Sequence, residues 1–527
     1  MRPFRINQCT VFLALLMIMF VAFLPGCGGG SGGDGPEAAG GSSGGEANGA
    51  GESALAVTST IPESGALDVP TDTTIEIAFN EDIEPGTVTL STIVLRSGSA
   101  AIPGKVSCSE AQVVFTPAHP LSQSAVYTAR VTTGVKDTAG IPLASDYTWE
   151  FTTLGRADPS VQSKWAAAAA GESHVLALKT DGTLWAWGCN ASGQLGDKEG
   201  GDGTHASDRS APIRVGQGAD WAAVTAGLLT SLAIRDNGTL WAWGRGSLGD
   251  GTTGLNVSPV QIGGDHDWSC PDTGLVHTFT VALKTDGTLW AWGRNASGQL
   301  GNGTGGDHTD DHDSLVPVQV GTDADWGIVA AGKDHVAAIR TDGTLWAWGC
   351  NNHGQVGDGT GGDPENDFPL NAPVPVEPDA DWIAISSGIQ YSLAIGSDGS
   401  LWGWGYNWHG QIGDGTRISR NIPVRAGDDA GWESVAAGWD HSAAIRKDGT
   451  LWTWGSNNAG QLGDGTRVER HSPGQVGTLR SWVAVTAGRY YTIALQEDGT
   501  LWAWGINACG QLGDGTQSER LTPVKVR

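Results

Sequence analysis

The sequence is poor in basic residues. It has 30 lysines and arginines against 57 aspartates and glutamates, which gives a formal net charge of −27. An acidic surface of this size repels phosphate backbones, so nucleic acid is not an expected partner. Charged residues make up only 17% of the 527 positions, whereas 81 positions are glycine. This composition favours a loop-rich all-β protein over a helical one.

Cysteine is also scarce, and its spacing is not that of a metal site. Two of the seven cysteines, Cys9 and Cys27, lie in the N-terminal segment. The others are Cys108, Cys189, Cys270, Cys350 and Cys509. No two are close enough in sequence to form a typical zinc ligand pair, so we predict neither a metal nor another cofactor and expect free, buried thiols.

One long apolar run is present, at the N-terminus. Arg2 and Arg5 precede an apolar stretch from Val11 to Leu24, which is followed by Pro25, Gly26 and Cys27. This order predicts a secretory signal over residues 1–27. Its end resembles the lipobox of bacterial lipoproteins, and the resemblance implies that Cys27 is acylated and becomes the mature N-terminus. Gly28 after it implies sorting to the outer membrane or cell surface. The alternative is an ordinary signal peptide with a chance cysteine.

Two segments separate this signal from the rest of the chain. Residues 28–53 are almost entirely small or acidic and predict a flexible linker. Residues 54–155 contain alternating apolar and polar runs such as 74–79 and 127–131, which predict an antiparallel β-sandwich. The segment resembles the bacterial immunoglobulin-like domains of surface-layer proteins. That resemblance implies a spacer or adhesive module without catalysis.

The remainder of the chain, residues 160–527, is a sevenfold repeat. Leu-Trp-x-Trp-Gly occurs seven times, first at 184–188 and last at 501–505, and uses 14 of the 24 tryptophans. Successive copies are 49 to 56 residues apart, a period typical of stacked or radial repeats. Asp-Gly or Asn-Gly stands between two apolar runs in every unit, which predicts tight β-hairpins.

The unit is similar to the regulator-of-chromosome-condensation repeat. The string Gly-x-Asn-x-x-Gly-Gln-Leu-Gly-Asp-Gly-Thr recurs nearly complete five times, for example at 455–466, while unit 2 is three residues shorter and lacks its Asn and Gln. The resemblance implies a seven-bladed β-propeller, and the predicted fold is therefore an all-β chain with an N-terminal immunoglobulin-like β-sandwich. We further predict that residues 522–526 close the ring by pairing with the first unit near Trp165.

Strand geometry predicts the role of the repeated tryptophans. Residues i and i+2 of a strand share a face, so the two rings of each motif point the same way. The middle residue is small in most units. We therefore predict that the rings form the core between blades and do not bind a ligand.

Other candidate sites lie where the repeats differ. A slot after each Ala-Gly-type turn holds His174, Thr230, His335, Tyr391, His441 and Tyr491, with His277 or Phe279 in unit 3. Because no carboxylate accompanies the histidines, we predict hydrogen bonds to neighbouring backbone, not metal binding. Acidic insertions at 197–208, 302–313 and 358–367 lack the spacing of a calcium loop and are expected to be solvated.

The candidate binding patch consists of aromatic residues outside the repeated slots. Trp408 and Trp439 stand where other units have small, polar or variable residues, and Tyr490 and Tyr491 lie in the next unit. Exposed aromatic residues in loops are typical interface anchors. Cys189 and Cys509 occupy corresponding loops of the first and last units, so a disulfide across the seam is a further hypothesis.

These features predict an exported, lipid-anchored envelope protein that is not an enzyme. The family resemblance implies a propeller that serves as a protein-interaction platform, with an unknown protein or glycan as partner and the membrane contacted through the N-terminal lipid. A carbohydrate-binding or adhesive surface protein is one alternative. A guanine-nucleotide-exchange-like regulator is another, although export and acidity argue against it. A structural disc without a specific ligand is a third.

Overall fold

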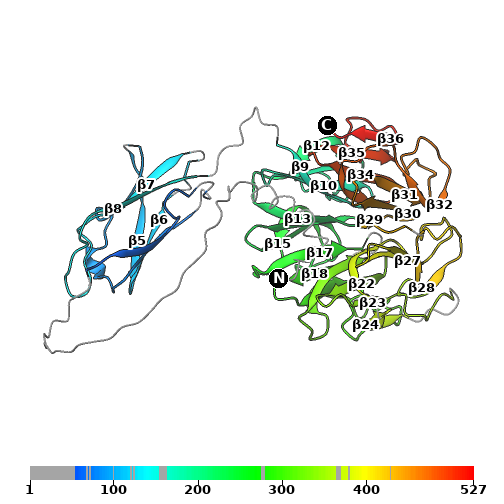
Figure 1. Ribbon diagram of the computed structural model, residues 1–527, viewed down its shortest axis with the longest axis horizontal. Coiled ribbons are helices and arrows are strands. Elements are labelled where there is room, and N and C mark those ends of the chain that lie inside the picture. Colours follow the sequence, from blue (N-terminus) through cyan, green and yellow to red (C-terminus); the bar gives the residue numbers. More distant parts are fainter. Residues whose placement is uncertain are drawn as a thin grey trace, which may run out of the picture. The chain divides into compact units, whose positions relative to one another are not determined.

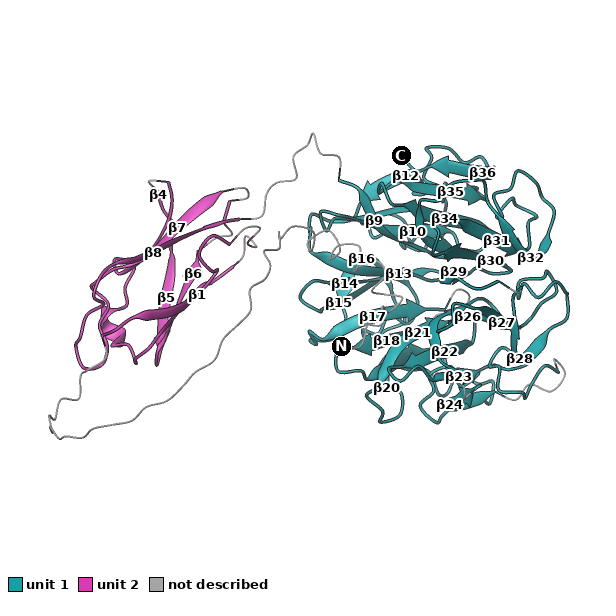
Figure 2. Cartoon of the chain, viewed as in Figure 1, with its two compact units in different colours: residues 1–25, 163–527 teal, residues 26–162 magenta. Residues whose placement is uncertain are grey.

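The computed structural model describes two compact units. The described residues are 54–66, 69, 73–98, 100–118, 121–122, 125–153, 163–274, 279–363, 369–377, 380–427 and 429–527. One unit contains the described residues up to 153, and the other spans Ser163–Arg527 (Figure 1 and Figure 2). The predicted signal peptide, the linker and the lipid site at Cys27 lie outside the described residues. In the described part, no helix has both the length and the apolar character needed to span a membrane.

The first unit is a sandwich of two four-stranded antiparallel sheets, as predicted. Their strand orders are β1-β2-β6-β5 and β4-β3-β7-β8. The strands are β1 (Val57–Ile61), β2 (Ile75–Phe79), β3 (Ile93–Ser97), β4 (Ala100–Ala101), β5 (Gly104–Ser109), β6 (Gln112–Pro117), β7 (Val126–Val131) and β8 (Tyr147–Thr152), with a 3-10 turn η1 (Pro85–Thr87). Alternate residues of β2 and β7 are buried in a shared core with Phe115 and Trp149, which explains the period-two pattern.

The second unit is a ring of seven four-stranded antiparallel sheets. Each blade uses four consecutive strands. The first strands line the central channel: β9 (Trp165–Ala170), β13 (Trp221–Ala226), β17 (Trp268–Thr273), β21 (Trp326–Ala331), β25 (Trp382–Ser387), β29 (Trp432–Ala437) and β33 (Trp482–Ala487). The second strands are β10 (His174–Lys179), β14 (Thr230–Arg235), β18 (Phe279–Lys284), β22 (His335–Arg340), β26 (Tyr391–Gly396), β30 (His441–Arg446) and β34 (Tyr491–Gln496).

The third strands carry the tryptophan motif, and the fourth form the outer edge. The third strands are β11 (Leu184–Gly188), β15 (Leu240–Arg245), β19 (Leu289–Gly293), β23 (Leu345–Gly349), β27 (Leu401–Gly405), β31 (Leu451–Gly455) and β35 (Leu501–Gly505). The fourth strands are β12 (Arg209–Arg214), β16 (Leu255–Gln261), β20 (Ser314–Gln319), β24 (Leu370–Val376), β28 (Arg420–Arg425), β32 (Arg470–Gln475) and β36 (Arg520–Lys525).

Antiparallel pairing gives the ring two different faces. The turn between the first and second strands and the long loop between the third and fourth strands emerge at the same end of each blade. We call this side the loop face. The Asp-Gly hairpin turns and the connections between blades form the opposite side, the turn face.

The prediction of ring closure by residues 522–526 is wrong. These residues belong to β36, which pairs with β35 of its own blade, and β9 pairs with β10. A periodic sequence can be divided into blades at any of its strands. Here each blade begins at the strand with the channel-lining tryptophan, so its four strands are consecutive in sequence and no strand has to pair across the seam. The first and last blades therefore meet by packing and by isolated hydrogen bonds, such as Trp165 N to Gly499 O (3.0 Å) and Gly515 N to Ser210 O (2.8 Å). Figure 1 shows β35 and β36 of the last blade in the same part of the ring as β12 of the first.

The second tryptophan of each motif forms the contact between blades, as predicted. Trp187 and its six counterparts are completely buried, while the first tryptophans are half-buried. In six blades both rings pack against the channel-strand tryptophan of the same blade, as Trp185 and Trp187 do against Trp165 at 6.1 and 5.7 Å between ring centroids, and in blade 2 Trp241 packs against Trp221. Six of the seven second indoles also donate to a glutamine carbonyl of the preceding blade, at 2.8–3.0 Å.

The repeated loop that contains the Asn and Gln positions the carbonyl oxygen that accepts this indole N–H. In blade 6, the Asn457 side chain is fully buried; its Oδ1 accepts from Leu462 N and its Nδ2 donates to Asp464 and Thr466. These bonds fold the loop so that the Gln461 carbonyl accepts the Trp504 indole N–H of blade 7. The repeated Asn and Gln are therefore structural.

The short second unit shows the consequence of losing this loop. It lacks the Asn and Gln. The indole nitrogen of Trp292, which faces this unit from blade 3, is buried without a hydrogen-bond partner in the described part of the chain. Gly249 keeps the position that the equivalent glycines have in the other units: a Cβ there would lie 2.8 Å from Trp292 Nε1, as one at Gly513 would from Trp187 Nε1.

The histidine slot also bridges neighbouring blades. The Nε2 atoms of the three histidines lie 2.9–3.0 Å from hydroxyl oxygens of the next blade: His174 to Ser231, His335 to Ser392 and His441 to Thr492. These partners are side chains, not the backbone groups that we predicted. The tyrosines of the slot do reach backbone, as Tyr391 donates to the carbonyl of His441 at 2.6 Å. His277 lies outside the described residues, and Phe279 is buried.

Acid should destabilise the propeller through these histidines. Burial lowers the pKa of His174 to about 3, of His335 to about 4 and of His441 to about 3. Unfolded histidines titrate near 6.5, so below that pH the unfolded chain binds protons that the folded chain does not, and stability falls as the pH drops. The three together should cost roughly 8 kcal/mol at pH 4.5 relative to neutral pH. Denaturant unfolding at the two pH values measures this loss.

The matched control is His441→Tyr, which places in blade 6 the residue that blades 5 and 7 carry in this slot. It should remove about one third of the acid destabilisation. If the pH profiles of the two proteins coincide, the buried histidines are not the cause.

Candidate functional site

The loop face carries the aromatic residues predicted to bind a partner. Trp439 lies in the turn between β29 and β30, and Tyr490 lies in the equivalent turn between β33 and β34. Their ring centroids are 5.8 Å apart, edge to face. The Arg489 guanidinium lies 3.9 Å from the Trp439 ring and 5.3 Å from the Tyr490 ring. Trp439, Arg489 and Tyr490 form one half-buried group, which we call the turn patch.

The turn patch extends across the seam to the first blade. Arg489 Nη1 lies 2.6 Å from Glu172 Oε1, which belongs to the turn between β9 and β10. Burial raises the pKa of Glu172 against the opposing effect of Arg489. The turn patch and this ion pair therefore span blades 6, 7 and 1.

Trp408 belongs to a second apolar group, nearer the outer edge of the loop face. It lies in the loop between β27 and β28 and is 65% exposed. The adjacent His409 Nδ1 is 2.7 Å from Glu469, which also pairs with Arg417. Ile418 and Val468, which are also exposed, are next in sequence to Arg417 and Glu469, and we call Trp408, Ile418 and Val468 the rim patch.

Tyr491 does not belong to a surface patch. It is completely buried, and its hydroxyl donates across the seam to the carbonyls of His174 (2.7 Å) and Gly171 (3.0 Å). Burial raises its pKa well above the usual value. The repeat register contains this information, because it places Tyr491 in the same slot as the buried histidines.

The central channel is lined mostly by small side chains of the first strands and has a cavity of about 230 Å³. Two carboxyl-bearing residues, Asp272 and Glu433, are among its described lining residues, and the carboxyl of Asp272 is hydrogen-bonded to neighbouring blades. It accepts hydrogen bonds from Thr225 of blade 2 (3.2 Å) and from Ala331 N of blade 4 (2.9 Å). Burial raises its pKa to about 6. Asp272 thus ties three blades together.

The acidic insertions use their carboxylates within their own loops. Asp197 Oδ1 accepts from Asn190 Nδ2 at 2.9 Å and from Glu199 N at 3.0 Å. Asp307 Oδ1 accepts from Thr309 N and from its hydroxyl. Residues 364–367 of the third insertion lie outside the described residues. In the described parts of the insertions, the carboxylates do not converge as calcium ligands do.

The seam holds a side-chain cluster that the sequence analysis found only in part. Cys189 and Cys509 come together there as free thiols, in agreement with the predicted proximity but without the disulfide. His205 and Asp208, from the insertion of blade 1, complete the cluster. The spacing of 16 and 19 residues from Cys189 gives no local signal for such a group.

Comparison with protein families matches both units. Residues 51–153 match the bacterial Ig-like domain. Residues 165–194, 181–234 and 221–250 match the regulator of chromosome condensation (RCC1) repeat, and residues 272–527 match the RCC1-like domain.

Two plant proteins match about half of the chain. The ultraviolet-B receptor UVR8 of Arabidopsis thaliana is 31% identical over 263 residues, which are 48% of this chain and 56% of the receptor. The mitochondrial RCC1 domain-containing protein RUG3 of the same plant is 29% identical over 280 residues, 51% of this chain and 60% of RUG3. The chain thus spans less than two thirds of these relatives.

Two solved structures show the same fold. Prp20p of Saccharomyces cerevisiae superposes with a TM-score of 0.56 at 20% identity. The match covers 69% of this chain and 89% of the Prp20p chain. Human WBSCR16 superposes with a TM-score of 0.57 at 20% identity, and the match covers 66% of this chain and 94% of the WBSCR16 chain. At this identity the likeness concerns the fold alone.

Proposed function

Because the chain carries a bacterial Ig-like domain followed by a propeller of RCC1 repeats, we propose that it is an exported, lipid-anchored envelope protein whose propeller binds another protein. The N-terminal order of arginines, apolar run and Cys27 supports export and anchoring. The small-residue linker 28–53 and the Ig-like domain serve as spacers between membrane and propeller.

The turn patch carries the proposal of a protein partner. Tryptophan, tyrosine and arginine are the residues most enriched among interface hot spots, and here one of each is packed into a single group on the loop face. The relatives are consistent with binding: the fold neighbour Prp20p has binding properties to Gsp1p and histones. The repeated residues form the core of the propeller, so recognition of a partner falls to the loops that differ between blades.

A carbohydrate ligand is the second candidate, and Trp408 favours it. Its ring is 65% exposed at the rim, as stacking on a sugar requires. Trp439 does not share this property, because Arg489 and Tyr490 cover its ring. The two candidates therefore depend on different tryptophans.

Substitutions separate these candidates. Trp439→Ala should reduce capture of a protein partner from envelope extracts by at least tenfold, since a hot-spot residue contributes about 2 kcal/mol or more. Loss of glycan-array binding on Trp408→Ala, with protein capture retained, would favour the carbohydrate candidate. Quantitative mass spectrometry of the captured proteins is the measurement.

The matched control is Leu479→Ala, which truncates an apolar side chain that is 50% exposed on the turn face. It should leave capture unchanged, and thermal unfolding checks that each variant is folded. Equal capture by the wild type, Trp439→Ala and Trp408→Ala would exclude both patches.

Lipid anchoring is tested at Cys27. The wild type should incorporate labelled palmitate and partition into the detergent phase, because two or more acyl chains anchor a protein stably. Cys27→Ser should be unlabelled and remain in the aqueous phase, while Cys108→Ser, a cysteine of the Ig-like domain, should behave as the wild type. Membrane association of Cys27→Ser at the wild-type level would contradict the anchor.

A further inference from the structure

The seam between blades 1 and 7 differs from the other blade junctions in its connectivity. The chain itself crosses six junctions as it passes from one blade to the next, whereas the seventh joins the first blade to the last. No strand is shared there, since β36 pairs with β35 and β9 with β10. A cross-link at this junction would close the ring.

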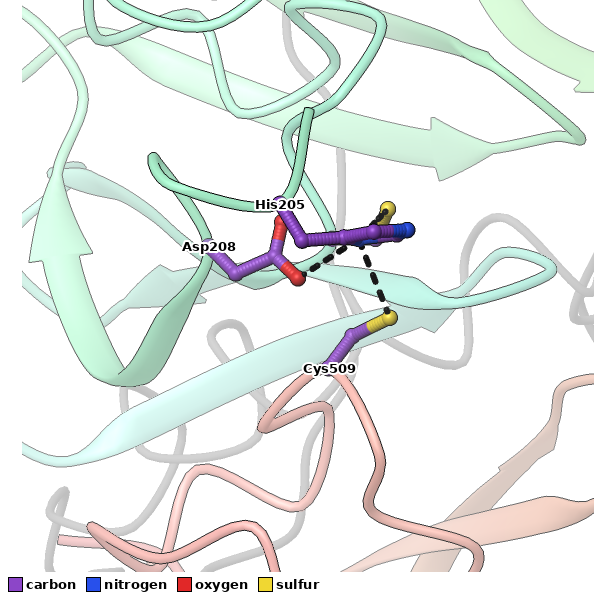
Figure 3. A group of neighbouring side chains, drawn as sticks. His205, Asp208 and Cys509 are labelled. Atoms are coloured by element: carbon purple, nitrogen blue, oxygen red, sulfur yellow. Dashed lines mark hydrogen bonds and ion pairs between the residues drawn. The ribbon is translucent and has the colours of Figure 1, made fainter. Parts of the chain in front are cut away.

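Four side chains of metal-binding types, two cysteines, a histidine and an aspartate, meet at this junction on the loop face. Cys189 and the pair His205 and Asp208 come from the loop between β11 and β12, and Cys509 comes from the loop between β35 and β36. One ligand atom from each of the four lies within 4.8 Å of the others. Figure 3 shows the His205 ring between the carboxylate of Asp208 and the sulfur of Cys509.

The distances suit a single tetrahedral ion. His205 Nδ1 is 3.7 Å from Cys189 Sγ, 4.0 Å from Cys509 Sγ and 2.9 Å from Asp208 Oδ2. Zinc bond lengths of about 2.3 Å to sulfur and about 2.0 Å to nitrogen or oxygen place tetrahedral ligands roughly 3.3–3.8 Å apart. The other ligand pairs lie within 4.8 Å of one another, so shifts of up to about 1 Å would bring all four ligands to this spacing.

The surrounding structure holds the ligands in place. Asp208 Oδ1 accepts from Asn190 N at 2.8 Å, which leaves Oδ2 directed at the cluster, and the Asp208 side chain is only 4% exposed. Cys189 N donates to Ser173 O, and Cys509 N donates to the Gln511 side chain. The bond to Asp208 is of the kind that orients a carboxylate ligand in metal sites, and the two cysteine N–H bonds, which recur in other blades, fix the backbone that carries the thiols. The exposed His205 side chain gives an ion access from solvent.

Blade 3 shows that the loop does not need these residues to fold. Its insertion is built in the same way: Asn295 N donates to Asp313 Oδ1 at 2.7 Å, as Asn190 N does to Asp208. Arg294 and Asp310 stand there in place of Cys189 and His205 and form an ion pair at 3.8 Å. Cys189 and His205 of blade 1 thus serve something other than loop structure.

We propose that Cys189, His205, Asp208 and Cys509 bind one zinc ion across the seam and so fasten the first blade to the last. Two thiolates, an imidazole and a carboxylate match zinc, whereas calcium and magnesium prefer oxygen ligands alone. Binding releases two thiol protons to solvent, and the ion with two thiolates and one carboxylate has a net charge of −1. Four protein ligands saturate the ion, so its role is structural.

A disulfide between Cys189 and Cys509 is the rival, and it accounts for fewer of the residues. It uses the two sulfurs, requires an oxidant that takes up two electrons, and gives His205 and Asp208 no part. The zinc site uses all four side chains.

Cobalt substitution tests the site. The full-length reduced chain, freed of metal with a chelator, should bind one Co²⁺ with the visible bands of tetrahedral coordination and with thiolate charge-transfer absorption. Zn²⁺ should displace the cobalt and raise the melting temperature. Cys509→Ser should weaken binding at least 100-fold and His205→Ala at least tenfold, and the Cys189→Ser/Cys509→Ser double variant should neither bind nor be stabilised.

The control is Cys350→Ser, which alters the cysteine at the position of Cys189 in blade 4 and should bind as the wild type does. Tryptophan fluorescence checks that all variants are folded. Failure of the reduced wild type to bind Co²⁺, a Cys189–Cys509 disulfide in a protein that takes up no metal after reduction, or unchanged binding by the double variant would each overturn the proposal. Metal binding without a rise in melting temperature would overturn the fastening role.

Discussion

The second tryptophan of each Leu-Trp-x-Trp-Gly motif makes the contact on which the ring depends. Its indole is fully buried between blades, and in six blades it donates to a glutamine carbonyl of the preceding blade. Burial of one such ring is worth roughly 4–6 kcal/mol before entropy losses, and the hydrogen bond adds about 1 kcal/mol. The loop with the repeated Asn and Gln holds that carbonyl in position. The small residue between the two tryptophans of the motif lets neighbouring blades pack closely.

The blades and the buried tryptophans could be predicted from the sequence, because the spacing of residues within the repeat determines which side chains share a face of a strand and where the turns lie. Strand parity placed both tryptophans on one face, and the Asp-Gly pairs located the hairpins. The closure of the ring could not be predicted, because a periodic chain gives no sign of which strand begins a blade. The partners of the buried histidines, hydroxyls of the next blade, depend on how two blades pack, which spacing along one chain does not encode.

The candidate sites illustrate the same limit. Trp408 and Trp439 were found because they break the repeat, and Tyr490 lies against Trp439 as the register suggests. Tyr491 was wrongly assigned to the surface patch because it is an aromatic residue, although it occupies the repeat position that the buried histidines have in other units. His205 and Asp208 were missed because they meet Cys509 only through the closed ring, some 300 residues away in sequence. The turn patch, its ion pair to Glu172 and the four-residue cluster all lie on the loop face at or beside the seam. A fastened seam would hold the recognition surface in one geometry.

The most direct test of the account compares one substitution in two blades. Trp454→Phe and Trp292→Phe remove the same atoms from two fully buried rings, but only Trp454 donates to a glutamine carbonyl, that of Gln411 at 2.9 Å. The measurement is the free energy of unfolding in denaturant. Loss of the hydrogen bond should cost Trp454→Phe about 1 kcal/mol more than Trp292→Phe, and equal losses would show that the indole–carbonyl bond does not stabilise the ring.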